Sequence, residues 1–151
     1  MSVCTFIASD FPLPQVAPSQ EYPLEINIDE GTIYDGGADD NFFLHTFEDV
    51  QSYTDKKYGV WLEWHYTDGR AEKILKYMKD ILQNTDSIEL WHVWLMDYFE
   101  YDERPVIHKR TAAIAEITVD DIKEIDDAEI WNNPDNRNPN RPSFYCLKIS
   151  R

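Results

Sequence analysis

The sequence predicts an α+β fold with a largely antiparallel or mixed sheet of five to seven strands, one long helix and one short helix. Three stretches carry this prediction. Residues 58–66 alternate between apolar and polar side chains, which is the period of a strand with one covered face. Residues 70–83 repeat apolar side chains at the spacing of an amphipathic helix. Residues 88–99 are apolar at nearly every position, as expected of a central strand covered on both faces.

The N-terminal third reads as short strands separated by a proline-rich connection. Residues 3–8 form a first apolar strand, and residues 9–23 contain four prolines, which fix the backbone and exclude a helix. Residues 24–28 alternate in polarity and predict a second strand, with a short return strand at 32–34. Residues 42–47 predict one more strand before the central stretch.

The C-terminal half supplies the remaining elements. Residues 106–116 predict a strand that forms a long hairpin with the 88–99 strand, because only a short acidic turn separates the two. Thr118 begins a capping pattern with an acid three positions later, which predicts the short helix at about 119–127. Residues 143–149 alternate in polarity and predict a final strand.

Length and charge limit the functional classes. A chain of 151 residues predicts one domain, residues 1–151. A formal net charge of −15 repels phosphate backbones and anionic lipid, so we expect no binding to nucleic acid or to a membrane surface. The sequence has no 18-residue apolar run and no basic segment followed by an apolar one at its start, which predicts a cytoplasmic protein. The charge suits a basic protein partner, a cation, or solubility alone.

No motif predicts catalysis, a cofactor or a metal. The sequence lacks GxSxG, Walker and dinucleotide-binding patterns, and it has only five glycines. Cys4 and Cys146 lie in apolar runs outside any CxxC, so we expect buried thiols; a disulfide is the alternative if their strands pair. The acidic loop 35–41 contains glycines and carboxylates that suit calcium, but a tight turn is the favoured interpretation because the EF-hand spacing is absent.

The first candidate site is an acidic and aromatic segment between two strands. Its carboxylates crowd a strand end and a turn without a helix-capping role to explain them. Acids interleaved with aromatic rings suit a docking surface for a basic protein. The predicted partner-binding residues are Asp97, Tyr98, Glu100, Tyr101, Asp102 and Glu103.

The second candidate site is a pocket lined by aromatic rings, for a small molecule or a substrate. It requires the flanking strands to bring their polar and aromatic residues together. The alternative is that His65 lies on a polar surface and His92 is a hydrogen-bonded core residue, since no HExxH-type spacing supports a metal site. The pocket residues would be Trp61, Glu63, His65, Trp91 and His92.

The segments CTFIASDFPLP (4–14), EYPLEINIDEGTIYDGGADDN (21–41) and WLEWHY (61–66) resemble small bacterial proteins without an assigned activity. The general character of the chain, small, acidic and rich in aromatic residues, is similar to that of toxin-immunity proteins. That resemblance implies a non-catalytic protein, monomer or homodimer, that neutralises a basic partner such as a nuclease. An enzyme or small-molecule-binding domain is the second hypothesis.

Overall fold

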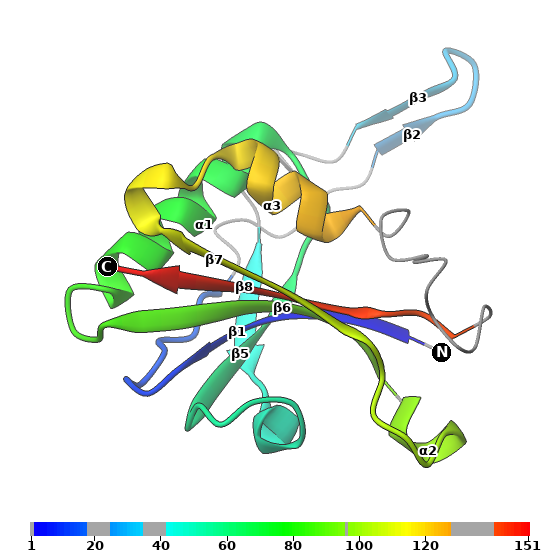
Figure 1. The fold of residues 1–151 in the computed structure, drawn as a ribbon. Coiled ribbons are helices and arrows are strands. Elements are labelled where there is room, and N and C mark those ends of the chain that lie inside the picture. Colours follow the sequence, from blue (N-terminus) through cyan, green and yellow to red (C-terminus); the bar gives the residue numbers. More distant parts are fainter. Residues whose placement is uncertain (1, 18–24, 35–41, 96, 128–140) are drawn as a thin grey trace.

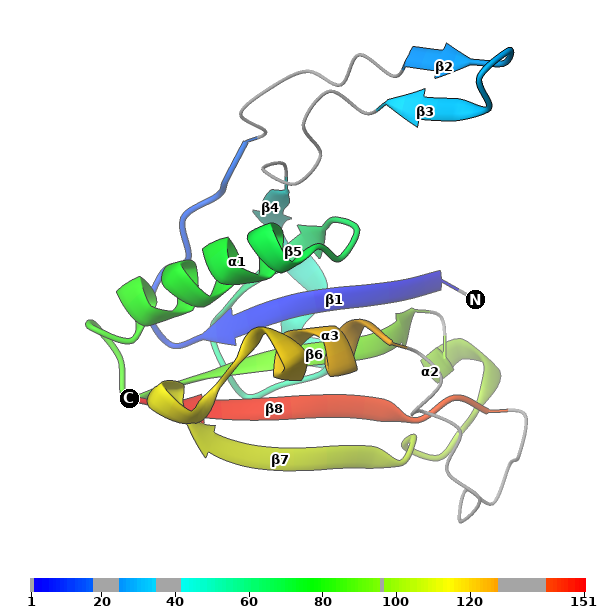
Figure 2. The ribbon, with the colours of Figure 1, turned by 90° about the horizontal axis from the view of Figure 1, so that it is seen from above.

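The computed structural model describes residues 2–17, 25–34, 42–95, 97–127 and 141–151. Its main feature is one six-stranded mixed sheet in the order β4-β5-β1-β6-β8-β7, in which only β7 and β8 are parallel (Figures 1 and 2). The strands are β1 (Ser2–Ser9), β4 (Phe43–Thr46), β5 (Tyr58–Glu63), β6 (Ser87–Leu95), β7 (Ile107–Ala113) and β8 (Phe144–Ser150). The predicted α+β class is confirmed.

Two helices cover one face of the sheet (Figure 1). Helix α1 (Asp68–Ile81) lies two residues earlier at each end than the sequence indicated, because Thr67 is the N-cap and accepts a hydrogen bond from the Arg70 backbone N–H at 3.2 Å. Helix α3 (Val119–Asp126) begins with a capping box in which the Thr118 backbone N–H donates to Asp121 Oδ2 at 2.8 Å.

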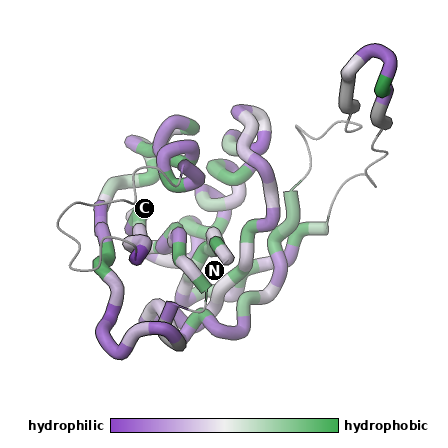
Figure 3. The backbone as a smooth tube through the Cα atoms, turned by 90° about the vertical axis from the view of Figure 1, so that its right-hand side faces the viewer, coloured by the Kyte–Doolittle hydropathy of each residue, from purple (hydrophilic) through white to green (hydrophobic). Residues whose placement is uncertain are grey.

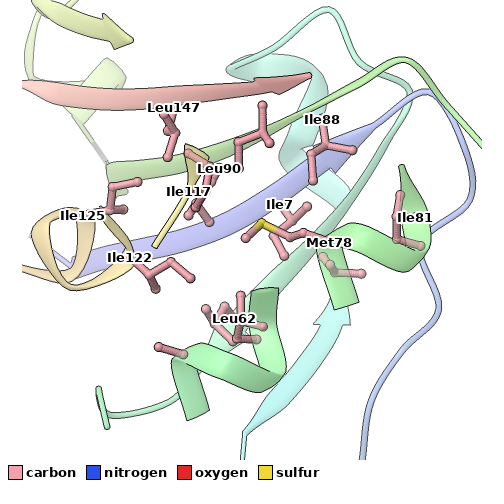
Figure 4. Packing of buried hydrophobic residues seen from close by; sticks show 14 of the residues in the cluster. Ile7, Leu62, Met78, Ile81, Ile88, Leu90, Ile117, Ile122, Ile125 and Leu147 are labelled. Atoms are coloured by element: carbon pink, nitrogen blue, oxygen red, sulfur yellow. The ribbon is translucent and has the colours of Figure 1, made fainter. Parts of the chain in front are cut away.

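The larger core lies between these helices and the sheet. Figure 4 shows apolar side chains of the strands facing those of both helices. From the strands come Ile7, Leu62, Ile88, Leu90 and Leu147, and from the helical layer Met78, Ile81, Ile117, Ile122 and Ile125. Burial of this many aliphatic groups is the main source of stability in a chain of this size.

The opposite face of the sheet carries a second, aromatic core. Phe6 of β1 has its ring centroid 4.7 Å from that of Phe47 and is stacked at 6.0 Å on Trp91. The 3₁₀ helix η2 (Glu48–Ser52) covers part of this face, and the short helix α2 (Asp97–Glu100) lies at one end of it (Figure 1). Much of the aromatic content is therefore core.

The predicted hairpin between the 88–99 and 106–116 strands is wrong. β8 lies between β6 and β7, antiparallel to β6 and parallel to β7. β8 is buried on both faces along most of its length, whereas Lys109, Arg110 and Thr111 in the middle of β7 are exposed. The more apolar strand takes the interior position, and the charged one lies at the edge, where it also discourages pairing with other chains. β7 ends at Ala113, before a 3₁₀ turn, η3 (Ile114–Glu116).

A second sheet consists of the hairpin β2 (Glu25–Asn27) and β3 (Thr32–Tyr34), whose turn uses Gly31 at φ 64°. The predicted loop at 35–41, with its calcium alternative, lies outside the described residues. No helix in the described part of the chain is long and apolar enough to cross a membrane. Accordingly, Figure 3 shows hydrophilic and hydrophobic residues alternating along the helices and strands.

Candidate functional site

The acidic segment 97–103 is held in place from inside the protein. Arg141 donates from Nε to Asp97 Oδ1 at 3.0 Å and from Nη2 to Asp97 Oδ2 at 2.6 Å, and both side chains are almost fully buried. Arg141 Nη2 also donates to the Glu103 carbonyl oxygen at 2.7 Å, and its guanidinium lies 4.3 Å from the centroid of the Tyr101 ring. Hydrogen bonding to Asp97 raises the pKa of Arg141 further above its usual range.

Only some of the predicted partner-binding residues are exposed on the surface of this segment. Glu100, Asp102 and Glu103 are exposed, and Tyr101 is half-buried. Asp97 is fully buried, so its assignment to a docking surface is wrong; its carboxylate is consumed by the ion pair that anchors the segment. The side chain of Tyr98 lies outside the described residues. What remains on the surface is a set of three carboxylates on an anchored turn.

A second cluster of acids lies on and just after helix α3, at Asp120, Asp121, Glu124, Asp126 and Asp127. Asp121 caps α3 and forms an ion pair with Arg110, and these contacts lower the pKa of its carboxyl against the opposing effect of burial. Asp126 is half-buried, which raises its pKa. Asp121 therefore stabilises α3 and its contact with β7, so it carries less weight as part of a docking surface than the acids of the 97–103 turn.

The predicted aromatic pocket does not form. Phe6 pairs with Trp61 on one side and with Trp91 on the other, so all three rings lie on the same face of the sheet. Glu63 shares that face, where its Oε2 lies 3.0 Å from His45 Nε2. His92 follows Trp91 and therefore points to the opposite, helical face. Trp61, Glu63 and Trp91 therefore share one face of the sheet, and His92 lies on the other face, so the five predicted residues do not converge on one pocket.

The two histidines of that hypothesis have ordinary positions. His92 is buried against α3 beside the backbone of Ile125, and burial lowers its pKa to about 4. This is the core histidine of the alternative interpretation. His65 lies beyond the end of β5 on the surface, and its carbonyl oxygen accepts a hydrogen bond from Arg70 Nη1 at 2.6 Å. Among the described residues, no group of three or more His, Cys, Asp and Glu is placed to hold a metal ion.

The two cysteines are buried free thiols. Cys4 is paired with Val93 of β6, and Cys146 lies on the other side of β6, opposite Trp91. Two strand spacings put their Cα atoms more than about 9 Å apart, beyond the reach of a disulfide. Burial raises the pKa of the Cys4 thiol to about 12 and that of Cys146 as well, so neither supplies a thiolate nucleophile at neutral pH.

One site was missed by sequence reasoning. A groove of about 510 Å³ lies on the face of the sheet opposite α1 and α3, over β6, β8 and β7. Its lining residues are Asp10, Gln51, Ser52, Tyr53, Thr54, Asp55, Lys56, Glu89, Trp91, Arg104, Ile107, Lys109, Thr111, Cys146 and Lys148. The sequence offered one signal for this groove, the charged Lys148 within an otherwise mostly apolar strand. Its neighbours on β6 and β7 could be identified only from the strand order.

Comparison of the chain with protein-family models, with curated proteins and with solved structures finds no match.

Proposed function

We propose that this chain is a non-catalytic, cytoplasmic protein that docks a basic protein partner through the surface of the 97–103 turn, as a toxin-immunity protein does. The observation that carries the proposal is the buried Asp97–Arg141 ion pair beneath exposed Glu100, Asp102 and Glu103. An exposed acidic turn alone is ordinary for a chain of net charge −15. In this protein the buried Arg141 side chain contacts the turn at two points, the Asp97 carboxylate and the Glu103 carbonyl oxygen.

The anchoring matters because ordering a flexible loop on binding costs free energy. Each immobilised long side chain costs about 0.5–1.5 kcal/mol on association, and a turn already fixed in the free protein avoids part of that cost. Arg141 fixes the turn at its start through Asp97 and near its end through the Glu103 carbonyl. The three carboxylates are then presented together to a cationic surface.

The charge of the molecule supports the same function kinetically. A net charge of −15 attracts a basic protein over about one Debye length, about 8 Å at physiological ionic strength. Steering of this kind raises the association rate constant and makes it fall as salt rises. A cysteine-nucleophile enzyme has little chemical support, because burial raises the pKa of both thiols and holds them in their neutral form.

The experiment has two stages. The tagged protein is first recovered from its native cells at low and at high salt, and bound proteins are identified by mass spectrometry. The association rate constant with the purified partner is then measured for a triple variant, Glu100→Gln, Asp102→Asn and Glu103→Gln. A matched control triple, Glu48→Gln, Glu72→Gln and Asp80→Asn, removes the same charge from exposed positions elsewhere.

We expect the turn variant to associate about tenfold more slowly at low salt and to show a weaker salt dependence, because rim charges act mainly on the association rate. The association rate constant of the control should fall only slightly, because the control loses net charge but no charge at the docking surface. Equal losses in both variants would show that net charge alone acts, and salt-independent binding would contradict the proposal.

A further inference from the structure

The floor of the groove is built by three strands whose side chains alternate between the two faces of the sheet. Strand register places Glu89, Lys148 and Thr111 in one row. The next row on the same face contains Trp91, Cys146 and Lys109. Residues 51–56, Arg104 and Ile107 also line the groove. The groove is therefore lined by chain segments that come from distant parts of the sequence.

Three cations of the groove have no anionic partner. Arg104, Lys109 and Lys148 are exposed and form no ion pair with any residue in the described ranges. Lys56 differs, since its Nζ lies 3.1 Å from Asp10 Oδ2 and 3.0 Å from Ser87 Oγ. The groove lining as a whole carries four cations against the three carboxylates of Asp10, Asp55 and Glu89, whereas the chain has a net charge of −15.

Two of the three acids in the groove lining are engaged, Asp10 by Lys56 and Glu89 by Thr54, while Asp55 is exposed. Glu89 is the cross-strand neighbour of Lys148, the position from which it would neutralise that lysine. Its carboxylate instead accepts a hydrogen bond from Thr54 Oγ1 and lies 3.5 Å from Cys146 Sγ. Among the described residues, Lys148 therefore has no ion-pair partner, and Glu89 is hydrogen-bonded to Thr54 instead.

The floor also contains a hydrogen-bond donor without an acceptor. Trp91 is 2% exposed, and its indole Nε1 has no hydrogen-bond partner among the described residues. Leaving a buried donor unpaired costs about 1–3 kcal/mol. Lys109 Nζ lies 6.0 Å from the centroid of the same indole ring, so donor and cation occur together. The groove therefore combines three cations that form no ion pair with a described residue, one buried donor and one exposed carboxylate, Asp55.

We propose that this groove binds a small organic anion that carries a phosphate or a carboxylate group. A volume of about 510 Å³ is within the ordinary range of small-molecule sites. Lysine and arginine are the side chains that recognise phosphate and carboxylate. Among the acids of the lining, Asp10 is paired with Lys56 and Glu89 is hydrogen-bonded to Thr54, which leaves Asp55 as the carboxylate that opposes an anion there. More distant acids act little, because salt screens charges separated by more than about 8–10 Å. A nucleic acid is disfavoured by the overall charge.

A purely structural role explains only part of the cluster. Lysine on an edge strand prevents pairing with other chains, which accounts for Lys109 on β7. Lys148 lies on an interior strand, and Arg104 comes from the segment before β7, so neither protects a sheet edge. Their convergence with Lys109 on one groove is what indicates a ligand. This site is separate from the 97–103 carboxylates, and the two proposals can fail independently.

The test uses inorganic phosphate and citrate as separate probes, titrated into the full chain at constant ionic strength. Binding is followed by ¹H–¹⁵N NMR shifts of the backbone and the indole groups. The groove variant is Lys109→Gln with Lys148→Gln. The matched control is Lys76→Gln with Lys79→Gln, two exposed lysines of α1 on the opposite face of the sheet. Arg104→Gln is a second groove variant outside the strands, which keeps the test valid if the strand variant folds poorly.

We expect saturable shifts of Trp91, Cys146 and Lys109 with at least one probe, and the preferred probe identifies the anionic group. Removing charge-assisted hydrogen bonds should weaken binding about tenfold or more in either groove variant. The control should bind within about twofold of the unaltered chain. Absence of saturable binding with both probes, or equal weakening in the groove variants and the control, would overturn the proposal.

Discussion

At the scale of single residues, His92 links stability to pH. Burial against α3 lowers its pKa from 6.5 to about 4, so the folded protein disfavours the protonated form. Stability from this group is complete above the unfolded pKa and is lost as pH falls from about 6.5 toward 4. Between pH 7 and 5 the chain should lose about 2 kcal/mol of unfolding free energy through His92. Urea unfolding at the two pH values measures the loss.

The control for this prediction is His92→Gln, which retains a hydrogen-bonding side chain without a titrating ring. All other ionisable side chains are the same in the two proteins. The difference between the two pH profiles therefore reports His92 alone. Parallel profiles would contradict the prediction.

The Asp97–Arg141 pair is the second determinant at this scale. Asp97→Asn leaves a guanidinium buried without its counter-charge, which should cost about 3–5 kcal/mol of unfolding free energy. The double variant Asp97→Leu with Arg141→Met should be less destabilised than Asp97→Asn, because it buries no unpaired charge. Arg110→Gln, at the partly exposed ion pair with Asp121, is the matched comparison and should cost less than about 1 kcal/mol. Urea midpoints of all four proteins decide this.

At the scale of elements, η2 depends on a close approach to β5. A Cβ atom on Gly59 would lie 2.7 Å from Val50 Cγ2, and Gly59 O accepts a hydrogen bond from the Phe47 backbone N–H at 2.9 Å. Gly59→Ala should therefore push η2 away from the sheet and cost about 1–3 kcal/mol of unfolding free energy. Adding Val50→Ala removes the closer contact with Cγ2 and leaves the Cβ of residue 50 at 2.9 Å, so the double variant should be somewhat more stable than the sum of the two single effects predicts. Strict additivity in thermal unfolding would show that the two residues do not interact.

The elements also show what the sequence could predict. Periodicity located α1, α3 and the strands, because one covered face leaves a repeat of 3.6 or of 2 in the chain. The order of the strands in the sheet, by contrast, leaves no periodic pattern in the sequence. β8 lies beside β6 because it is the more apolar strand and is buried on both faces, whereas the middle of β7 is charged and exposed. That preference appears only when the two strands are compared within the whole sheet. The groove depends on that order, since Lys109 and Lys148 become neighbours of Trp91 only through β8.

The acidic segment shows the same limit at the level of one side chain. Its composition predicted an exposed acidic surface, and Glu100, Asp102 and Glu103 are exposed. Asp97 is buried because Arg141, 44 residues away in the chain, supplies its counter-charge. A local pattern cannot contain the partner of a long-range ion pair, so burial of a single acid within an acidic run escapes sequence reasoning.

At the scale of the whole molecule, β8 attaches the edge strand β7 to the other four strands of the sheet. It is the only strand paired with β7 in the described part of the chain, and it covers one edge of β6. Phe144, Leu147 and Ile149 are fully buried and contribute to both cores. Burial of three such side chains is worth about 5–9 kcal/mol. That amount is comparable with the roughly 5–15 kcal/mol of net stability that folded domains have.

A chain ending at residue 142 should therefore lose cooperative folding rather than lose stability gradually. Near-UV circular dichroism of the tryptophans and urea unfolding measure this, and a peptide of residues 143–151 added in trans should restore part of the signal. The control is a chain without Arg151 alone, whose Nε donates to the Leu82 carbonyl at 2.8 Å. That chain should fold with a loss of about 1–2 kcal/mol. A cooperative transition in the chain ending at 142 would mean that β1, β5 and β6 with α1 form a stable unit without β8.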